Sequence, residues 1–337
     1  MPRRVYPSAD MNLETPAGMS LGATRTDSLK GFVAEIFARL GVPHEAARLT
    51  AAALVAADVE GLSSHGVALV PTYVERMLAG SVSPETEPTV MHDAGSAIVL
   101  DACHILGPLS SDWTLPMVSE RAREHGLACV TVRNGSHFGN AAFWARQIAE
   151  GGLIGIVMCN SHPSKAPPGG VERLTGANSL AIALPSTDAQ PFVVDLDVGG
   201  VPSDPAAAIA AMLVPGAAAK GFGLAAAIDL VCGGLSGGAL GPEVGAFDGD
   251  PAQPYGCAHL FMAIDPARFA IAGLGERVAR FAERVRGSRR AHGVARIYAP
   301  GDRARARLAE SDECLLAPEL LAKLKECGAK VGVEGAL

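Results

Sequence analysis

Apolar, β-prone runs alternate with polar turns through the middle of the chain. The turns are rich in glycine, proline, serine and asparagine, so the alternation predicts strands that bring their loops to one region. Runs of this kind occupy residues 97–101, 127–133, 153–159, 179–184, 191–195 and 258–264. Loops held by a rigid sheet are where binding groups gather, and we expect a site among these loops.

Helical periodicity is present towards both ends of the chain. From Leu29 on, apolar residues recur at i, i+3, i+4, i+7, i+8 and i+11, which predicts one amphipathic helix that ends at Gly41. Its expected N-cap is Asp27 or Ser28. An alanine-rich run predicts a second helix at 43–58. Further helices are predicted at 73–80, 113–125, 140–150, 205–213, from Lys220 onward, at 276–286 and at 317–326. A turn is expected at 107–111 and a loop at 298–307.

The composition is that of a globular protein, because 49% of the 337 residues are hydrophobic and 19% are charged. This length suits one large domain or two ordinary ones. The net charge of −7 argues against a basic face for nucleic acid. No stretch approaches the ~20 apolar residues of a membrane-spanning helix. The first residues lack the apolar core of a signal peptide. We therefore expect a cytoplasmic protein with neither a nucleic-acid nor a membrane partner.

The cysteines are odd in number and scattered, at positions 103, 129, 159, 232, 257, 314 and 327. No CxxC pair and no Cys/His spacing indicates zinc or a disulfide framework. Most of them lie in apolar runs, where free buried thiols are typical. The sequence thus predicts a reducing compartment and no metal site.

One candidate for chemistry lies at the end of the second predicted helix. There, Ser63, Ser64 and His65 stand between two glycines, where side chains can be directed outward rather than packed. The segment is either a serine-capped turn with a surface histidine or a proton-transfer site. In the second case a hydroxyl would orient an imidazole that titrates near neutral pH. The residues alone leave both interpretations open.

A second candidate is the segment NGSHFGN after the strand at 127–133. His137 lies between Gly135 and Gly139, and Asn140 is placed to cap a helix. Free backbone N–H groups at 140–143 could then bind a phosphate or an amide such as the nicotinamide carboxamide. A purely structural loop is the alternative. No GxGxxG follows any predicted strand, so the signature of a Rossmann nucleotide site is missing.

Later loops carry further polar candidates. The strand at 191–195 ends in Asp195 and Asp197, which are solvated carboxylates or ribose ligands. Lys220 opens a helix against the helix dipole, which favours an anionic partner. Arg303 belongs to an arginine-rich loop that is either ordinary surface or a contact for a nucleotide ribose or phosphate.

The order of these motifs resembles a known family, the malate/L-lactate dehydrogenase-like NAD(P)-dependent oxidoreductases. That family includes ureidoglycolate and sulfolactate dehydrogenases and Δ1-piperideine-2-carboxylate/Δ1-pyrroline-2-carboxylate reductases. The similarity runs from about residue 27 to the C-terminus. The motifs that carry it are SSHGVALVPTYVERMLAGSV, VRNGSHFGNAAFWA, PPGG, TGAN, VVDLD, SDPAAA, KGFGLA, AIDPARF and APGDRAR.

The resemblance implies an α+β, non-Rossmann fold with a central, largely antiparallel sheet and flanking helices. A helical domain at 27–90 would be completed by about 300–337, the α/β cofactor-binding domain would span 91–299, and 1–26 would be a flexible arm. A homodimer is also implied, with NAD or NADP in a cleft between domains and a small-molecule substrate beside it.

The resemblance also assigns roles to residues. His65 corresponds to the proton donor, Ser64 to its hydroxyl neighbour, and His137 to a catalytic histidine near nicotinamide and substrate. The residues expected to contact the cofactor are His137, Phe138, Gly139, Asn140, Ala141, Asp195, Leu196, Asp197, Lys220, Gly221, Gly301, Asp302 and Arg303. The residues expected at the substrate are Ser64, Leu69 and Asn178.

This chain departs from the family pattern at three places. Leu69 stands where the family has an arginine that would hold the substrate carboxylate. The segment 198–204 is shortened, which removes a relay aspartate. TGAN at 175–178 replaces Gly-Thr-Asn-Pro.

These features lead to two hypotheses. The first is an oxidoreductase that passes hydride to or from a C=O or C=N carbon of a small 2-oxo or 2-imino acid-like substrate. The departures favour an unusual substrate and a biosynthetic specialist. The second hypothesis is a scaffold that has lost redox chemistry and serves as a lyase, a cyclase or a binding protein.

Overall fold

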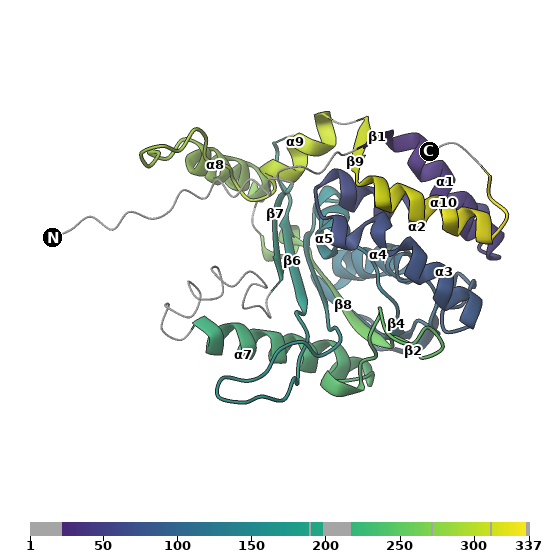
Figure 1. Ribbon diagram of the computed structural model, residues 1–337. Coiled ribbons are helices and arrows are strands. Elements are labelled where there is room, and N and C mark those ends of the chain that lie inside the picture. Colours follow the sequence, from purple (N-terminus) through teal and green to yellow (C-terminus); the bar gives the residue numbers. More distant parts are fainter. Residues whose placement is uncertain (1–21, 189, 198–216, 271, 311, 335–337) are drawn as a thin grey trace.

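A seven-stranded sheet forms the centre of the protein (Figure 1). The computed structural model describes residues 22–188, 190–197, 217–270, 272–310 and 312–334. In sheet order, the strands are β2 (Thr89–Asp93), β3 (Ala97–Asp101), β4 (Leu127–Gly135), β8 (Cys257–Ile264), β5 (Ile154–Cys159), β6 (Ser179–Leu184) and β7 (Phe192–Asp197). Within the described residues, β3 and β4 pair in parallel and the other neighbours pair antiparallel. The expected α+β fold with a largely antiparallel sheet is confirmed.

The central strand β8 is buried on both faces, which explains its nearly continuous apolar sequence. Phe261 and Ala263 belong to the main core, together with α4 (Gly107–His125) and α5 (Ala141–Glu150). The alternate residues Ala258 and Leu260 face the segment formed by α7 (Ala217–Asp229) and the π-helical turn η3 (Leu230–Gly234). Successive side chains of a strand point to opposite faces, so helices cover the sheet from both sides.

The helical part of the fold joins the two ends of the chain. Helices α1 (Thr26–Arg39), α2 (His44–Val59) and α3 (Val70–Ala79) precede the sheet, and α10 (Pro318–Lys330) follows it. Strand β1 (Gly22–Arg25) pairs antiparallel with β9 (Glu313–Leu316). Figure 1 shows α1 and α10 side by side. A helical region built from N- and C-terminal segments is therefore confirmed.

Several local predictions differ from the structure. The predicted arm, 1–26, ends in β1 and the first residue of α1, while residues 1–21 and the predicted helix at 205–213 lie outside the described residues. Neither Asp27 nor Ser28 is the N-cap of α1, since Thr26 already begins the helix. The predicted turn at 107–111 is the first turn of α4, where Ser110 and Ser111 hydroxyls bond the Gly107 carbonyl.

The remaining helices complete the fold near the site. The expected loop at 298–307 is wrong in its second half, because α9 (Asp302–Glu310) begins there with an acidic residue in its first turn. Helix α8 (Leu274–Arg286) extends the helix predicted at 276–286 by two residues. No described helix has both the length and the apolar character needed to cross a membrane.

Candidate active site

His65 lies on a three-residue 3₁₀ turn, η1 (Ser63–His65), immediately after α2. Its Nδ1 is 3.0 Å from the Ser64 hydroxyl oxygen. Ser64 is exposed and His65 is partly buried. The structure thus places a hydroxyl against an imidazole at a point that solvent reaches.

Asp58 lies under this turn, in the last turn of α2. Its Oδ2 accepts a hydrogen bond from the Val67 N–H at 2.7 Å. Its Oδ1 is buried and has no hydrogen-bond partner among the described residues. Burial raises the pKa of Asp58 to about 7, although the Val67 hydrogen bond acts in the opposite direction. No role beyond ending a helix was predicted for Asp58.

His137 approaches from the other half of the fold, on the loop between β4 and α5. Its ring centroid is 5.8 Å from that of His65. The Tyr73 hydroxyl of α3 is 2.9 Å from His137 Nδ1 and donates to the His137 carbonyl at 2.5 Å. Burial, and after it the charges of His65 and His259, lower the pKa of His137 to about 3. His137 is therefore neutral at physiological pH.

Behind His137 the loop is anchored to the sheet. Phe138 stacks on His259 of β8, with ring centroids 4.3 Å apart and planes 11° apart. The Trp144 indole N–H donates to the Phe138 carbonyl at 2.8 Å. Because His259 is fully buried, its pKa is lowered to about 4, and it serves as a neutral ring in the wall.

A second wall beside His137 is aromatic. The Phe247 ring lies 5.4 Å from His137 and 5.1 Å from Tyr73. Arg76 of α3, which is 1% exposed, holds this segment by donating to the carbonyls of Phe247 (2.8 Å), Ala246 (2.6 Å) and Gln253 (2.6 Å). The buried guanidinium thus fixes a loop that is far from it in the sequence, since Phe247 follows Arg76 by 171 residues.

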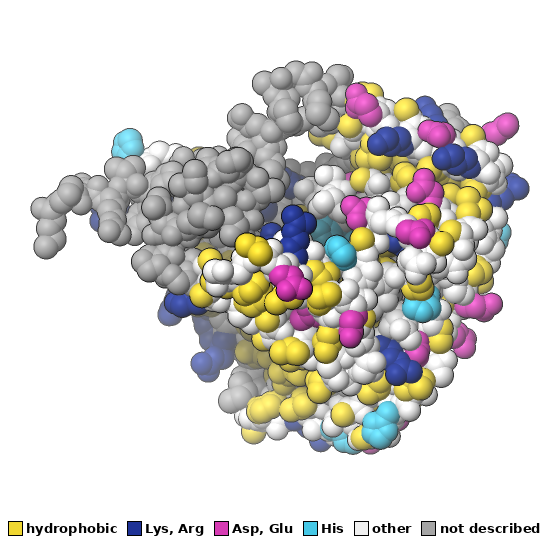
Figure 2. All heavy atoms as spheres, turned by 60° about the horizontal axis from the view of Figure 1, so that its bottom comes forward, with side chains coloured by type: hydrophobic (Ala, Val, Ile, Leu, Met, Phe, Trp, Pro, Cys, Tyr) yellow, Lys and Arg dark blue, Asp and Glu magenta, His cyan; other side chains and the backbone are white. Residues whose placement is uncertain are grey.

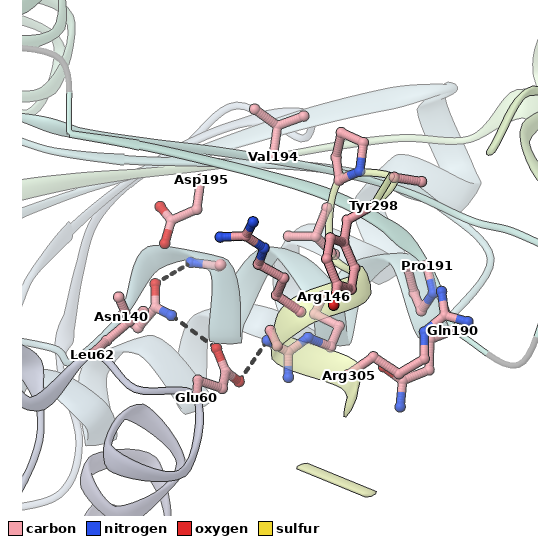
Figure 3. A pocket seen from close by; sticks show the side chains of 17 residues that line it. Glu60, Leu62, Asn140, Arg146, Gln190, Pro191, Val194, Asp195, Tyr298 and Arg305 are labelled. Atoms are coloured by element: carbon pink, nitrogen blue, oxygen red, sulfur yellow. Dashed lines mark hydrogen bonds and ion pairs between the residues drawn. The ribbon is translucent and has the colours of Figure 1, made fainter. Parts of the chain in front are cut away.

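A cavity of about 520 Å³ opens next to the segments that carry the two histidines (Figure 3). Leu62, three residues before His65, and Asn140, three residues after His137, both line it. Figure 3 shows the Asp195 side chain on the same side of the cavity as Asn140. The full lining is Glu60, Leu62, Asn140, Ala142, Arg146, Gln190, Pro191, Val193, Val194, Asp195, Tyr298, Ala299, Pro300, Gly301, Arg303, Ala304 and Arg305.

Charged side chains from three separate segments meet in this cavity. The Glu60 carboxylate, 3% exposed, pairs with Arg146 at 2.6 Å and accepts from the Asn140 amide at 3.2 Å. Arg305 contacts Asp302 at 3.3 Å, and its Nε is buried without a partner among the described residues. Gly301 has φ +90°, and a Cβ there would come within 3.2 Å of the Val193 nitrogen. Only glycine allows the α9 loop to lie this close to β7.

The sequence and the fold correspond to those of known enzymes. A sequence model described as malate/L-lactate dehydrogenase matches residues 24–202 and 196–325. This chain belongs to the malate/L-lactate dehydrogenase family. The match extends over most of the chain and includes both histidine segments.

Individual members of the family agree with this assignment. The malate dehydrogenase of Pyrococcus horikoshii is 29% identical over 348 residues, which cover 92% of this chain and 95% of its own. The (2R)-3-sulfolactate dehydrogenase (NADP(+)) of Chromohalobacter salexigens is 33% identical over 258 residues, which cover 68% of this chain and 77% of its own. The solved structure of malate dehydrogenase from Pyrococcus horikoshii OT3 has a TM-score of 0.86 at 29% identity and covers 94% of this chain and 97% of its own. The protein is an NAD(P)-dependent dehydrogenase.

The cavity of this dehydrogenase fits a nicotinamide nucleotide. A carboxylate at Asp195 can accept from ribose hydroxyls, and the guanidinium groups of Arg303 and Arg305 can meet phosphate oxygens. The buried, unpartnered Arg305 Nε is a donor that an anionic ligand would satisfy. The volume is also within the range of about 300–1,000 Å³ that ligand pockets usually have.

Of the residues predicted to contact the cofactor, Asn140, Asp195, Gly301 and Arg303 line the cavity. The others lie elsewhere: Phe138 and Ala141 are buried, Leu196 is exposed, and Lys220 and Gly221 lie on α7. The Asp197 side chain is outside the described part. Asp302 is buried, and Arg286, Arg305 and the Ala299 N–H all donate to its carboxylate. Contact of these residues with the cofactor stays a prediction.

The helix N-terminus at Asn140 differs in part from expectation. Asn140 is the N-cap of α5, as predicted, and its side chain accepts from the Ala142 N–H at 2.9 Å. The Phe143 N–H donates to the Asn140 carbonyl. Because the cap and the first helical turn already use these two N–H groups, they are unavailable as an anion site.

Two residues predicted to contact the substrate, Leu69 and Asn178, make contacts within the protein. Leu69 is partly buried and packs against the main core. Asn178 is buried, with its oxygen accepting from the Ser161 N–H and its amide donating to Thr175 Oγ1 and the Ala225 carbonyl. Their role at a substrate stays a prediction.

Part of the site was not predicted. Glu60, Arg146, Arg305, Tyr298 and Tyr73 were not chosen as site residues, although Tyr73 and Arg305 lie within the family motifs. Only long-range packing brings these side chains to the cavity or to His137. Over the described residues no cluster of His, Cys, Asp or Glu could hold a metal, and all seven cysteines are free thiols.

Proposed function

We propose that this dehydrogenase interconverts a small 2-oxo or 2-imino acid-like compound and its reduced form, with His65 as the proton donor. The observation that carries the proposal is the approach of two histidine rings, 5.8 Å apart, from two halves of the fold. Its relatives act on malate and sulfolactate, which are both 2-hydroxy acids. A biosynthetic role fits the departures from the family pattern.

The two histidines contribute in different ways. NAD(P)H, when bound, supplies the hydride that reduces the C=O or C=N carbon. His65, oriented by Ser64, gives a proton to the oxygen or nitrogen on which charge develops. His137, held neutral by its surroundings, positions the substrate without changing charge. In the oxidative direction His65 takes the same proton back.

Leu69 narrows the substrate class. An arginine at this position would hold a carboxylate with two parallel hydrogen bonds, and leucine offers none. The substrate is therefore a cyclic imine or a 2-oxo compound whose carboxylate is masked or is held by another group. An assay panel should include both a plain 2-oxo acid and a cyclic 2-imino acid.

His65→Ala tests the proposal directly. Nucleotide affinity is first measured by the fluorescence of NADH and NADPH, and turnover is followed by their absorbance over the substrate panel. We expect turnover to fall by roughly 10²–10⁴-fold, the usual contribution of a general acid, with nucleotide affinity nearly unchanged. His92→Ala, an exposed histidine on β2, is the matched control. Unchanged turnover would remove His65 as the proton donor, and no binding of either nucleotide would overturn the proposal as a whole.

The protein is also proposed to be a cytoplasmic homodimer. Leu224 of α7, Leu230 of η3 and Leu235, the residue after η3, are 41%, 61% and 61% exposed. Figure 2 shows hydrophobic side chains on the face where α7 lies. A second copy would remove such a surface from water. Seven free cysteines support a reducing compartment. Light scattering after size-exclusion chromatography tests the dimer, and cell fractionation tests the location.

A further inference from the structure

Asp58 has no part in the chemistry described so far, yet it lies against the turn that carries His65. One of its carboxylate oxygens bonds the Val67 N–H at 2.7 Å. The other is buried without a partner among the described residues. Leaving a buried acceptor unpaired destabilises the folded state. A serine hydroxyl could accept the same bond without leaving a second buried oxygen unpaired, so the carboxylate calls for an explanation beyond capping.

Gly66 shows how closely the acid and the turn fit. A Cβ built on Gly66 would overlap all three carboxyl atoms of Asp58. The backbone of Gly66, with φ −100° and ψ −150°, is in an extended conformation open to any residue. Glycine is therefore required here for space, not for conformation. The carboxyl fills the volume that a side chain would take, directly after His65 in the chain.

A side chain of another element is also within electrostatic range of Asp58. Cys314 of β9 is near enough that the Asp58 charge adds to burial in raising the pKa of the thiol. Lys30 of α1 acts on the same thiol in the opposite direction, as does the hydrogen bond from Thr26. The carboxyl thus lies at the end of α2 within electrostatic range of β9, the strand that α2 contacts.

We propose that Asp58 is a positioning residue for His65. Its carboxylate accepts from the Val67 N–H and packs against the backbone of Gly66. These contacts hold the turn in the position in which the His65 ring faces the His137 ring. A proton donor must be within about 2.6–3.2 Å of its acceptor, and a displacement of about 1 Å can cost 10²-fold in rate. The inference rests on the proposed function, in which His65 is that donor.

Two substitutions at Asp58 separate position from charge. Asp58→Asn keeps the volume and an oxygen that accepts from Val67, and we expect its kcat within about threefold of the wild type. Asp58→Ala leaves the Val67 N–H unpaired and opens space under Gly66, and we expect kcat to fall by roughly 10–10²-fold. The affinity for NADH or NADPH, measured by fluorescence, should change less than twofold in both, because Asp58 does not line the cavity.

A second test adds a methyl group on the other side of the contact, at Gly66. Gly66→Ala should lower kcat, because the added methyl group overlaps the carboxyl. Adding Asp58→Ala to Gly66→Ala should cost much less than Asp58→Ala alone, since the two changes act on one contact. All rates are measured well below the melting temperature of each variant, so that a loss of folded protein does not imitate a loss of turnover.

The outcomes are distinct. Wild-type kcat in fully folded Asp58→Ala would overturn the inference, and so would equal losses in Asp58→Asn and Asp58→Ala, because charge rather than position would then matter. If His65→Ala abolishes turnover while Asp58→Ala does not, only the Asp58 inference fails. If His65→Ala keeps its turnover, the proposed function fails first.

Discussion

The two histidines of the site are held in opposite ways. His137 lies in a loop whose flanking residues are buried, and Tyr73 contacts both its ring nitrogen and its carbonyl. His65 is on a three-residue turn, and the hydroxyl that meets its Nδ1 belongs to the exposed Ser64. One ring is fixed from several sides by the sheet and α3. The other depends on the shape of a short backbone segment.

This difference separates two tasks that a single histidine performs poorly. Burial lowers the pKa of His137 to about 3, so this ring keeps one charge state while it holds a ligand. His65 is in contact with solvent and can be reloaded with a proton after each turnover. In the proposed function, the ring with the fixed charge state gives the geometry, and the ring on the short solvent-accessible turn gives the proton.

The largest effect is expected for Arg76→Ala, which removes the anchor of the Phe247 segment that packs against His137. Three carbonyls would lose a buried cationic donor, and the Phe247 segment would lose its anchor. We expect the free energy of unfolding to fall by about 3–5 kcal/mol, the usual effect of breaking a buried charged network. Urea denaturation measures it. Arg280→Ala, an exposed arginine on α8, should change stability by less than about 0.5 kcal/mol.

A gentler change at His137 is Tyr73→Phe. The ring keeps its edge contacts with Phe37 (5.8 Å) and Phe247 (5.1 Å), while both hydroxyl contacts to His137 are lost. We expect a loss of about 1–2 kcal/mol of stability and a roughly tenfold lower kcat, because the ring is then free to turn. Thermal melting and steady-state kinetics measure the two effects. A variant with the full wild-type kcat would contradict the view that His137 must be fixed.

Asp58, which lies under the turn that carries His65, should make the stability of the protein depend on pH. The folded pKa of Asp58, about 7, lies above its ordinary value of 3.8, so ionising this group opposes folding. The cost is absent below about pH 4, grows through the window up to pH 7 and is complete above it. Asp58→Asn does not ionise, so its melting temperature should rise relative to the wild type between pH 5 and pH 8. A difference that stays constant over this window would refute the raised pKa.

The smallest effect is expected at Ser64. Its hydroxyl is exposed, and water can take its place at His65 Nδ1. Ser64→Ala should lower kcat only about two- to fivefold, within the net worth of one exposed hydrogen bond. Stability should not change measurably. A loss as large as that of His65→Ala would show that the hydroxyl itself transfers the proton.

Features that depend on local sequence patterns were predicted, and features that depend on long-range contacts were not. Apolar, β-prone runs predicted the central strands, and the cap at Asn140 was visible because an N-cap is a local feature. The β1–β9 pair joins residues nearly 300 positions apart, as in Gly22 with Leu316, and no local pattern predicts this pairing. The Glu60–Arg146 pair in the cavity is of the same kind.

The candidate site follows the same division. His65 and His137 were chosen from short motifs, and the structure brings their rings together. Asp58 and Tyr73 matter through the groups they touch in the folded chain, Val67 in one case and His137 in the other. Residues of this second type have ordinary neighbours in the sequence. Motif reading therefore finds the groups that react more readily than those that hold them.

The pairing of β1 with β9 also constrains how the enzyme is made. Strand β9, which contacts α2, is synthesised long after that helix. During synthesis, α2 and the turn that carries His65 must wait for β9 before their surroundings are complete. A chain that stops before β9 therefore lacks part of the surroundings of the turn that carries His65.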